Sequence, residues 1–186
     1  SVHGANRLGT NSLLDLVVFG KYAGLRAAEF ARGAEYQSLP ADPTEFTREQ
    51  FDRILSADGT QNAFDIGVEM KKVMFDDMGI FRSGKGMQNA LNVVRELQER
   101  FKHVTVTDKG KIFNMELMYG WELGNLLDLA EVTTVSALAR EESRGGHSRE
   151  DFPERDDQRW LKHTFAFVDE KGKIDLKYKS VTITRF

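Results

Sequence analysis

Arg7 lies in a glycine-bearing loop that directly precedes a predicted helix, and this arrangement suits the binding of an anion. The loop covers residues 4–11 and contains two glycines and two asparagines. The first N–H groups of a helix have no partner within the helix, and the helix dipole adds partial positive charge there. The planar guanidinium of arginine matches a carboxylate with two parallel hydrogen bonds. A carboxylate or a polarised carbonyl oxygen is therefore the group that this loop would hold.

The same pattern also fits an ordinary loop with a solvent-facing arginine, because glycine loops before helices are common. His3 lies beside the loop and could act as an acid or a base. A histidine that packs against the loop or a cofactor is the simpler interpretation. Residue types and spacing leave these alternatives open.

A second polar segment, residues 137–164, is rich in charge and contains His147 and His163. The spacing around these histidines is not that of metal ligands, so we predict no metal site. The chain has no cysteine, which excludes disulfides and cysteine-ligated iron–sulfur clusters within it. Taken alone, the segment is typical of a solvated surface.

The elements that must position these residues are mainly helical. We predict a helix over residues 13–31, capped by Asn11 or Ser12, whose first two turns are apolar nearly all round and so indicate burial in a larger core. Residues 32–46 contain two prolines and are expected to form a linker. Thr47 could cap the helix that follows.

Three further helices are predicted over residues 62–78, 85–102 and 114–142, with Ser83 as the cap of the second. Short connections between successive helices are typical of an antiparallel bundle. The second helix has the clearest apolar face, which consists of Met87, Ala90, Leu91, Val94, Leu97 and Phe101. Phe64 and Val68 are predicted to share a face with Val73, Met74 and Met78 in the first. The third helix carries an apolar set consisting of Leu117, Met118, Trp121, Leu126, Leu129, Val132 and Val135.

The C-terminal part is expected to contain a β-hairpin. Residues 143–158 are predicted to be an extended surface segment. Residues 162–177 alternate apolar and polar positions around a turn at residues 169–172, which indicates a β-hairpin followed by a strand or extended tail. The predicted fold class is therefore mainly α with a small β part.

Composition is that of a globular protein without a strongly charged partner. Of 186 residues, 40% are hydrophobic and 30% charged, and the net charge is −3. This weakly acidic balance argues against a dedicated nucleic-acid-binding protein. We find no signal peptide and no run of 18 apolar residues, so membrane association is expected only through partners. The chain starts directly on a dense motif without methionine, which suggests a fragment.

Two segments resemble one known family. The first, ANRLGTNSLLDLVVFG at residues 5–20, is similar to the signature near the end of the flavin domain in succinate dehydrogenase and fumarate reductase flavoproteins. The second, ESRGGHSREDFPERDDQRWLKH at residues 142–163, resembles the C-terminal pattern of the same flavoproteins. The resemblance covers nearly all of this chain, but only about a third of such an enzyme.

The resemblance implies specific roles for three residues. Arg7 matches the arginine that binds a substrate carboxylate. Ser12 and Leu13 match positions whose backbone contacts FAD, where N–H groups would stabilise the negative charge on the N1/C2=O edge of the reduced flavin. The catalytic acid or base lies upstream in the family, so no catalytic residue is expected within this chain.

The resemblance also implies partners. The substrate would be a dicarboxylate, succinate or fumarate, and electrons would pass to an iron–sulfur subunit. The expected location is cytoplasmic and peripheral to the inner membrane, through partner subunits. Residues 143–160 would be a strap that docks on the flavin domain. The expected ion-pair partners at that interface are Glu141, Glu142, Arg144, Arg149, Arg155 and Asp156.

A GxGxxG fingerprint for the FAD pyrophosphate does not occur in this sequence. The glycines within residues 83–86 follow a predicted helix, and we interpret them as a turn that enters the next helix. We therefore expect the chain alone to be inactive. Its expected parts are residues 1–33, the end of the FAD-binding domain; 34–46, a linker; 47–142, a helical bundle domain; and 143–186, the strap and hairpin tail. The missing N-terminal flavin and capping domains would complete the enzyme.

Two alternatives remain. An L-aspartate oxidase-like flavoprotein has a similar arginine-bearing loop, although the segment HSREDFPERDDQRWLKHT favours the succinate and fumarate enzymes. A helical interaction module without enzymatic activity is the other. The sequence does not distinguish succinate oxidation from fumarate reduction.

Overall fold

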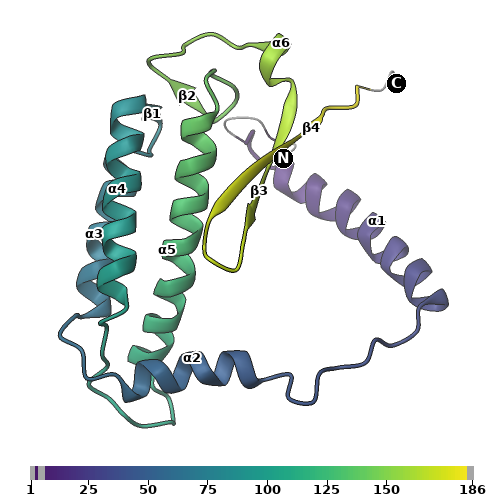
Figure 1. Ribbon diagram of the computed structural model, residues 1–186. Coiled ribbons are helices and arrows are strands. Elements are labelled where there is room, and N and C mark those ends of the chain that lie inside the picture. Colours follow the sequence, from purple (N-terminus) through teal and green to yellow (C-terminus); the bar gives the residue numbers. More distant parts are fainter. Residues whose placement is uncertain (1–2, 4–6, 184–186) are drawn as a thin grey trace. The chain divides into compact units, whose positions relative to one another are not determined.

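A computed structural model of the chain describes residue 3 and residues 7–183. The chain divides into two compact units, Ser1–Phe46 and Thr47–Phe186, each of which is described by itself. The described residues are mainly helical with a small strand part, as predicted (Figure 1). No helix in the described part of the chain is long and apolar enough to cross a membrane.

The first unit contains one long helix, α1 (Asn11–Gly33), which has no buried residue. The predicted cap is wrong, because the N-cap is Thr10, which has φ 66° and makes no side-chain capping bond. A tight backbone turn starts the helix instead, since Asn11 N–H donates to the Leu8 carbonyl at 3.2 Å. Helix α2 (Glu45–Ser56) begins before Thr47, so Thr47 does not cap it.

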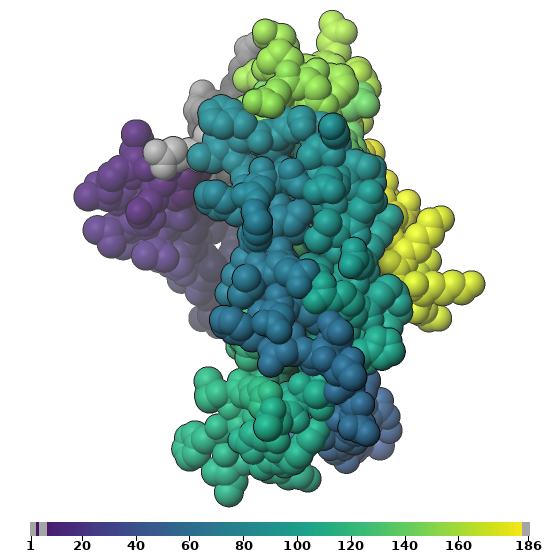
Figure 2. All heavy atoms as spheres, turned by 90° about the vertical axis from the view of Figure 1, so that its left-hand side faces the viewer, coloured from purple at the N-terminus to yellow at the C-terminus, as the bar shows by residue number. Residues whose placement is uncertain are grey.

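Helices α3 (Ala63–Asp76), α4 (Gly84–Phe101) and α5 (Met115–Ala139) form the antiparallel bundle of the second unit (Figure 1). Each starts at a polar side chain that accepts a backbone N–H, as N-caps do. Asn62 accepts from Phe64, Ser83 from Gly86 and Asn114 from Leu117. Figure 2 shows the side chains of α3 and α4 against one another along both helices.

The core of the bundle lies between these three helices. The predicted face of α4 is confirmed, with Met87, Ala90 and Val94 each 0% exposed. The predicted face of α3 is wrong at its start, because Phe64 is 64% and Val68 47% exposed. The buried residues of α3 are instead Ala63, Ile66, Gly67, Met70 and Val73.

Helix α5 differs from its predicted pattern in the same way. Leu126 and Leu129 are 43% and 61% exposed, whereas Leu123 and Leu127 are buried. Apolar residues occur around the whole circumference of this helix, so their spacing did not identify which stripe faces the core. Gly124 has α4 as its neighbour, since a Cβ there would lie 3.0 Å from the Phe101 ring.

The residues before α3 and after α4 are held together by backbone hydrogen bonds. Gln61 N–H donates to the His103 carbonyl at 3.1 Å, and Thr105 N–H donates to the Gln61 carbonyl at 3.2 Å. Gly59 lies so close that an ideal Cβ would be 1.9 Å from the same His103 carbonyl oxygen. Only glycine fits this approach without movement of the backbone.

We expect Gly59→Ala to destabilise the second unit by about 2–3 kcal/mol, because the added methyl group meets backbone rather than a movable side chain. Gly146→Ala is the matched control, since nothing lies within 4 Å of a Cβ there. Urea unfolding followed by circular dichroism measures both. Equal midpoints for the two variants would contradict the close approach.

Two small sheets complete the second unit. Strands β1 (Phe81–Arg82) and β2 (Ser148–Arg149) pair in parallel, while β3 (Lys162–Val168) and β4 (Ile174–Ser180) form the predicted hairpin. In the hairpin register, Phe165 pairs with Lys177 and Ala166 with Leu176. Side chains alternate between faces along a strand. The Phe165 face is therefore opposite to the Leu176 face.

Candidate functional site

The loop before α1 brings Arg7 to the N-terminus of that helix. The Arg7 Nη1 atom donates to the Ser12 hydroxyl at 2.6 Å. Arg7 is exposed and Ser12 is half-buried. Thr10 closes the turn between them, with its hydroxyl donating to the Gly9 carbonyl at 2.7 Å. The guanidinium is thus held near the positive end of a helix dipole, where an anion is favoured.

The backbone donors of Ser12 and Leu13 are not equivalent. Leu13 N–H already donates to the Thr10 carbonyl at 2.9 Å. Within residue 3 and residues 7–183, Ser12 N–H has no hydrogen-bond acceptor. The Ser12 N–H is therefore the stronger candidate for a ligand contact. A ligand contact by the Leu13 N–H also stays a prediction, although that N–H already has an acceptor.

His3 lies beside the loop and bonds to α1. Its Nε2 atom is 3.2 Å from Asp15 Oδ2. This contact gives His3 a structural partner in the helix. It agrees with the interpretation of His3 as a packing residue.

Helix α1 presents a bare apolar surface around the site. Leu13, Leu16 and Val17 are each more than 60% exposed, and Phe30 is 77% exposed. Large apolar patches of this kind mark surfaces that bind other protein elements. The loop and helix therefore offer an exposed apolar surface that another protein element could cover.

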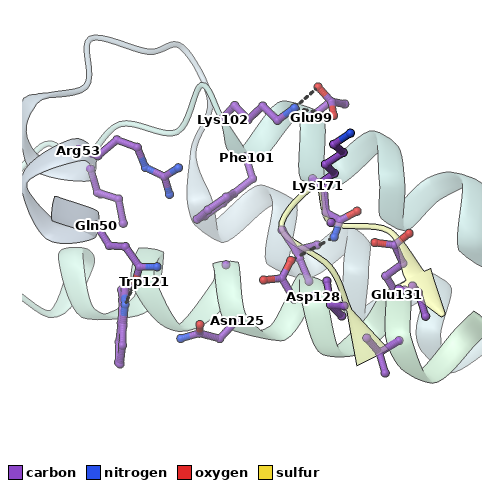
Figure 3. Close-up of a pocket in the computed structure, with 18 residues that line it drawn as sticks. Gln50, Arg53, Glu99, Phe101, Lys102, Trp121, Asn125, Asp128, Glu131 and Lys171 are labelled. Atoms are coloured by element: carbon purple, nitrogen blue, oxygen red, sulfur yellow. Dashed lines mark hydrogen bonds and ion pairs between the residues drawn. The ribbon is translucent and has the colours of Figure 1, made fainter. Parts of the chain in front are cut away.

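A cleft of about 640 Å³ is formed by residues of the second unit alone. Helix α2, the end of α4, the middle of α5 and the hairpin turn line it (Figure 3). Arg53 extends from α2 toward the ring of Phe101, and Lys171 lies on the hairpin side. We call this the α2–hairpin cleft. No group of three or more His, Asp or Glu residues in the described chain is placed to hold a metal ion.

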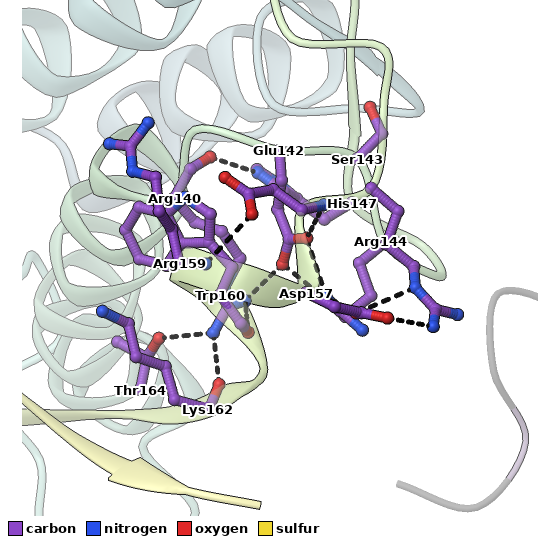
Figure 4. Close-up of polar contacts among 12 residues, drawn as sticks. Arg140, Glu142, Ser143, Arg144, His147, Asp157, Arg159, Trp160, Lys162 and Thr164 are labelled. Atoms are coloured by element: carbon purple, nitrogen blue, oxygen red, sulfur yellow. Dashed lines mark hydrogen bonds and ion pairs between the residues drawn. The ribbon is translucent and has the colours of Figure 1, made fainter.

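The segment after α5 is organised around a buried carboxylate (Figure 4). Glu142 is 0% exposed. It accepts from Arg140 Nη1 at 2.5 Å and from Arg144 at 2.8 and 2.9 Å. Asp156 N–H donates to the same carboxylate at 3.0 Å. Burial alone raises the pKa of Glu142, but these donors outweigh it and lower the pKa below its usual value.

Arg149 connects the ends of two helices. Its Nη1 atom donates to the Leu138 and Arg140 carbonyls at 3.1 Å, which satisfies carbonyls at the C-terminus of α5. Its other nitrogens bind both oxygens of Asp151 at 2.7 Å. Asp151 in turn accepts from Gly84 N–H at 2.9 Å, at the start of α4. Arg149 mainly, with this N–H, lowers the pKa of Asp151 to about 2.

The predicted strap is therefore built differently from the expectation. Glu142 and Arg149 are buried and bind within their own unit, so they are not docking residues on a solvated surface. Arg144 and Arg155 both pair with Asp157. The remaining two predicted partners also bind locally: Glu141 accepts from Arg159, and Asp156 caps the short helix α6 (Asp157–Trp160).

His147 is a half-buried part of this network. Its Nδ1 atom is 3.0 Å from Arg82 Nη1, and its Nε2 atom is 3.0 Å from the Arg140 carbonyl. Arg82 is a donor only, so Nδ1 accepts and Nε2 carries the proton. Burial is the main cause that lowers the pKa of His147, and the charges of Arg82, Arg149 and Arg140 add to it.

We expect the second unit to become less stable as the pH falls, because of His147. The unfolded histidine has a pKa near 6.5 and binds a proton more readily than the folded one. The stabilising contribution is thus complete above about pH 7 and is lost as the pH falls below 6.5 toward the folded pKa. Urea midpoints between pH 8 and 5 measure this. His147→Gln should flatten that part of the profile, and an unchanged slope would contradict the assignment.

Comparison with known proteins gives a consistent set of relatives. The family model described as fumarate reductase flavoprotein C-term matches residues 68–186. The succinate dehydrogenase flavoprotein subunit of Rickettsia bellii is 44% identical over 185 residues, covering 99% of this chain and 31% of that protein. The fumarate reductase flavoprotein subunit of Escherichia coli K12 is 44% identical, covering 98% of this chain and 31% of its own length.

Solved structures agree with these relatives. A variant of E. coli quinol fumarate reductase has a TM-score of 0.89 with 43% identity, covering 100% of this chain and 32% of its own. The Mycobacterium smegmatis Sdh1 complex in the apo form has a TM-score of 0.84 with 32% identity, covering 96% of this chain and 31% of its own. The chain thus spans about a third of the length of the proteins it matches.

Proposed function

This chain belongs to the succinate dehydrogenase and fumarate reductase flavoprotein family, and from that premise we propose that it forms part of an enzyme that interconverts succinate and fumarate. It would contribute the C-terminal third, including one wall of the flavin and substrate site. The family membership supports this role, and the chemistry of the loop before α1 supports the position of that wall.

The observation that carries the proposal is the pairing of Arg7 with Ser12 at the start of α1. The 2.6 Å bond from Nη1 to the Ser12 hydroxyl orients the guanidinium, and its other N–H groups, which have no acceptor among the described residues, would bind a carboxylate. A dicarboxylate fixed at one end by such a fork has its reacting C–H bond placed for transfer. Arg7 is in this proposal a binding and orienting residue.

The same loop fits a bound FAD. When bound, FAD would supply the centre that accepts a hydride from succinate. Ser12 N–H, which lacks an acceptor within the described residues, would donate to the N1/C2=O edge of the flavin. The exposed apolar surface of α1 would be covered by the remainder of a flavin domain.

We further propose that electrons leave through an iron–sulfur subunit. These 186 residues contain no cysteine, so they cannot themselves bind cysteine-ligated clusters. Attachment to the cytoplasmic face of the inner membrane would then depend on other partner subunits.

The test is to express the complete natural polypeptide that contains this sequence and assay it with succinate, fumarate and L-aspartate. We expect flavin to co-purify, and we expect succinate-dependent reduction of a soluble electron acceptor. Oxidation of L-aspartate in preference to succinate would favour an aspartate oxidase instead. Absence of flavin and of all three activities would favour an interaction module.

We expect the 186-residue chain alone to retain no FAD through gel filtration, because its sequence has no GxGxxG fingerprint for the pyrophosphate. Absorbance at flavin wavelengths, relative to protein, measures retention. Stoichiometric flavin in the eluted chain would contradict the view that only one wall of the site is present.

A further inference from the structure

The α2–hairpin cleft has the features of a separate ligand site, and we propose that it binds a nucleoside monophosphate. Its volume of about 640 Å³ lies within the range of small-molecule sites. All lining residues belong to the second unit, so the site does not depend on the loop that holds Arg7. Three kinds of group in the cleft lead to this ligand class.

The first kind is a pair of cations without counterions. Within the described residues, the side chains of Arg53 and Lys171 have no hydrogen bond or ion pair, although both line the cleft. The other charges there are mostly neutralised. Lys102 pairs with Glu99 at 2.6 Å, and Glu131 pairs with Arg95 at 2.8 Å outside the lining. Arg53 is thus free to bind an anion with its planar fork.

The second kind is a set of amides with unused groups. Gln50 accepts from Trp121 Nε1 at 2.7 Å through Oε1, which leaves its NH₂ group as a donor. Gln98 donates Nε2 to Asp128 at 3.2 Å, which leaves its Oε1 as an acceptor. Asn125 has no side-chain partner among the described residues. Free amide donors and acceptors match the polar edge of a nucleobase.

The third kind is an aromatic wall. Phe101 lies against Gly124, where the absence of a side chain lets the ring approach to 3.0 Å from an ideal Cβ position. In Figure 3 this ring extends into the space that Arg53 also enters. A planar base can stack on such a ring, while its phosphate reaches the guanidinium.

One feature limits the charge of the ligand. Asp128 lines the cleft and accepts only from the neutral Gln98 amide, so it repels anions. A single phosphate is attracted by the two cations, whereas each further phosphate adds negative charge to a cleft that three carboxylates already line, those of Glu99, Asp128 and Glu131. A monophosphate is therefore favoured over a di- or triphosphate.

Isothermal titration of the full chain with AMP, GMP, CMP and UMP tests the proposal. We expect at least one to bind saturably with a Kd below about 1 mM, and inorganic phosphate to bind at least about tenfold more weakly because it has no base to stack. Arg53→Gln should weaken binding about tenfold or more. Arg48→Gln, a matched charge change on the same helix outside the cleft, should leave the Kd unchanged.

Phe101→Leu separates stacking from charge, because it should weaken nucleotide binding but not the binding of inorganic phosphate. Circular dichroism confirms that each variant is folded before titration. Saturable binding that Arg53→Gln selectively weakens supports the site. No binding by any of the four nucleotides, or equal affinity in Arg53→Gln and Arg48→Gln, would overturn it. Neither result bears on flavin chemistry, so the proposed enzyme function is tested separately.

Discussion

Replacing Arg7 by alanine in the complete flavoprotein is expected to lower kcat/KM for succinate by about 10³-fold or more, while flavin content stays unchanged. The side chain provides a charge-assisted fork for one substrate carboxylate. Its loss removes both the attraction and the orientation of the reacting C–H bond. The flavin is unaffected in this view, because the proposed contact to it comes from the Ser12 backbone rather than from Arg7.

The conservative variant Arg7→Lys sharpens this test. Lysine keeps the charge but lacks the planar fork, so we expect part of the binding to return without full turnover. Arg26→Ala is a matched control on the same polypeptide, since Arg26 pairs with Glu29 on the exposed surface of α1. Steady-state kinetics and the flavin absorbance of each purified variant give the result. Near-normal kcat/KM in Arg7→Ala would remove the substrate-binding role.

The fold was predictable where local signals and packing agree. Ser83 precedes a helix with a single clear apolar face, and both the cap and that face are present in the structure. The sequence also predicted the loop and the helix within residues 7–33, although the N-cap is Thr10 and not Asn11 or Ser12. There a left-handed residue and a backbone turn start the helix, and side-chain propensity carries no signal for that.

The pattern failed where apolar residues outnumber the positions that the core can hold. Phe64 and Val68 have helical spacing, yet Ile66 and Met70 face the core instead. Both sets are apolar, so periodicity alone cannot rank them. Packing against α5 decides, and one contact in that packing is the Tyr119 hydroxyl, which would lie 2.1 Å from a Cβ at Gly67. This contact joins residues that are far apart in the sequence.

The polar strap was the largest difference from expectation. A run of alternating charges is typical of solvent or of an interface, and the sequence gives no sign that Glu142 is fully buried. Burial follows from the chain reversal at residues 144–147, which returns Arg149 to the end of α5. Only the tertiary structure shows that these charges bind one another.

Replacing Glu142 by glutamine is expected to destabilise the second unit by about 3–5 kcal/mol, a large part of the 5–15 kcal/mol that holds a domain together. Glutamine has nearly the same shape but presents one oxygen instead of two and no charge. Arg140 would lose its counterion while its side chain is only 15% exposed. An unpaired buried charge costs far more than a lost surface pair.

The effect should spread to the hairpin, because Arg140 also donates to the Trp160 and Lys162 carbonyls at 3.0 and 2.6 Å. Glu141→Gln is the matched control, since Glu141 is the adjacent residue, is 44% exposed and pairs with Arg159 on the surface. A surface pair of this kind contributes about 0–1 kcal/mol. Urea unfolding at pH 7 measures both free energies.

The pH dependence provides a second measurement of the same carboxylate. Its folded pKa is lowered, so its contribution is present above the unfolded pKa near 4.3 and is lost as the pH falls through the folded value. Asp157 adds to this acid-sensitive part, since Arg155 and Arg144 lower its pKa to about 2. The difference in stability between the wild-type chain and Glu142→Gln should therefore shrink as the pH falls below about 4. Equal losses for Glu142→Gln and Glu141→Gln, or a difference that does not depend on pH, would show that Glu142 is not the charged centre of the strap.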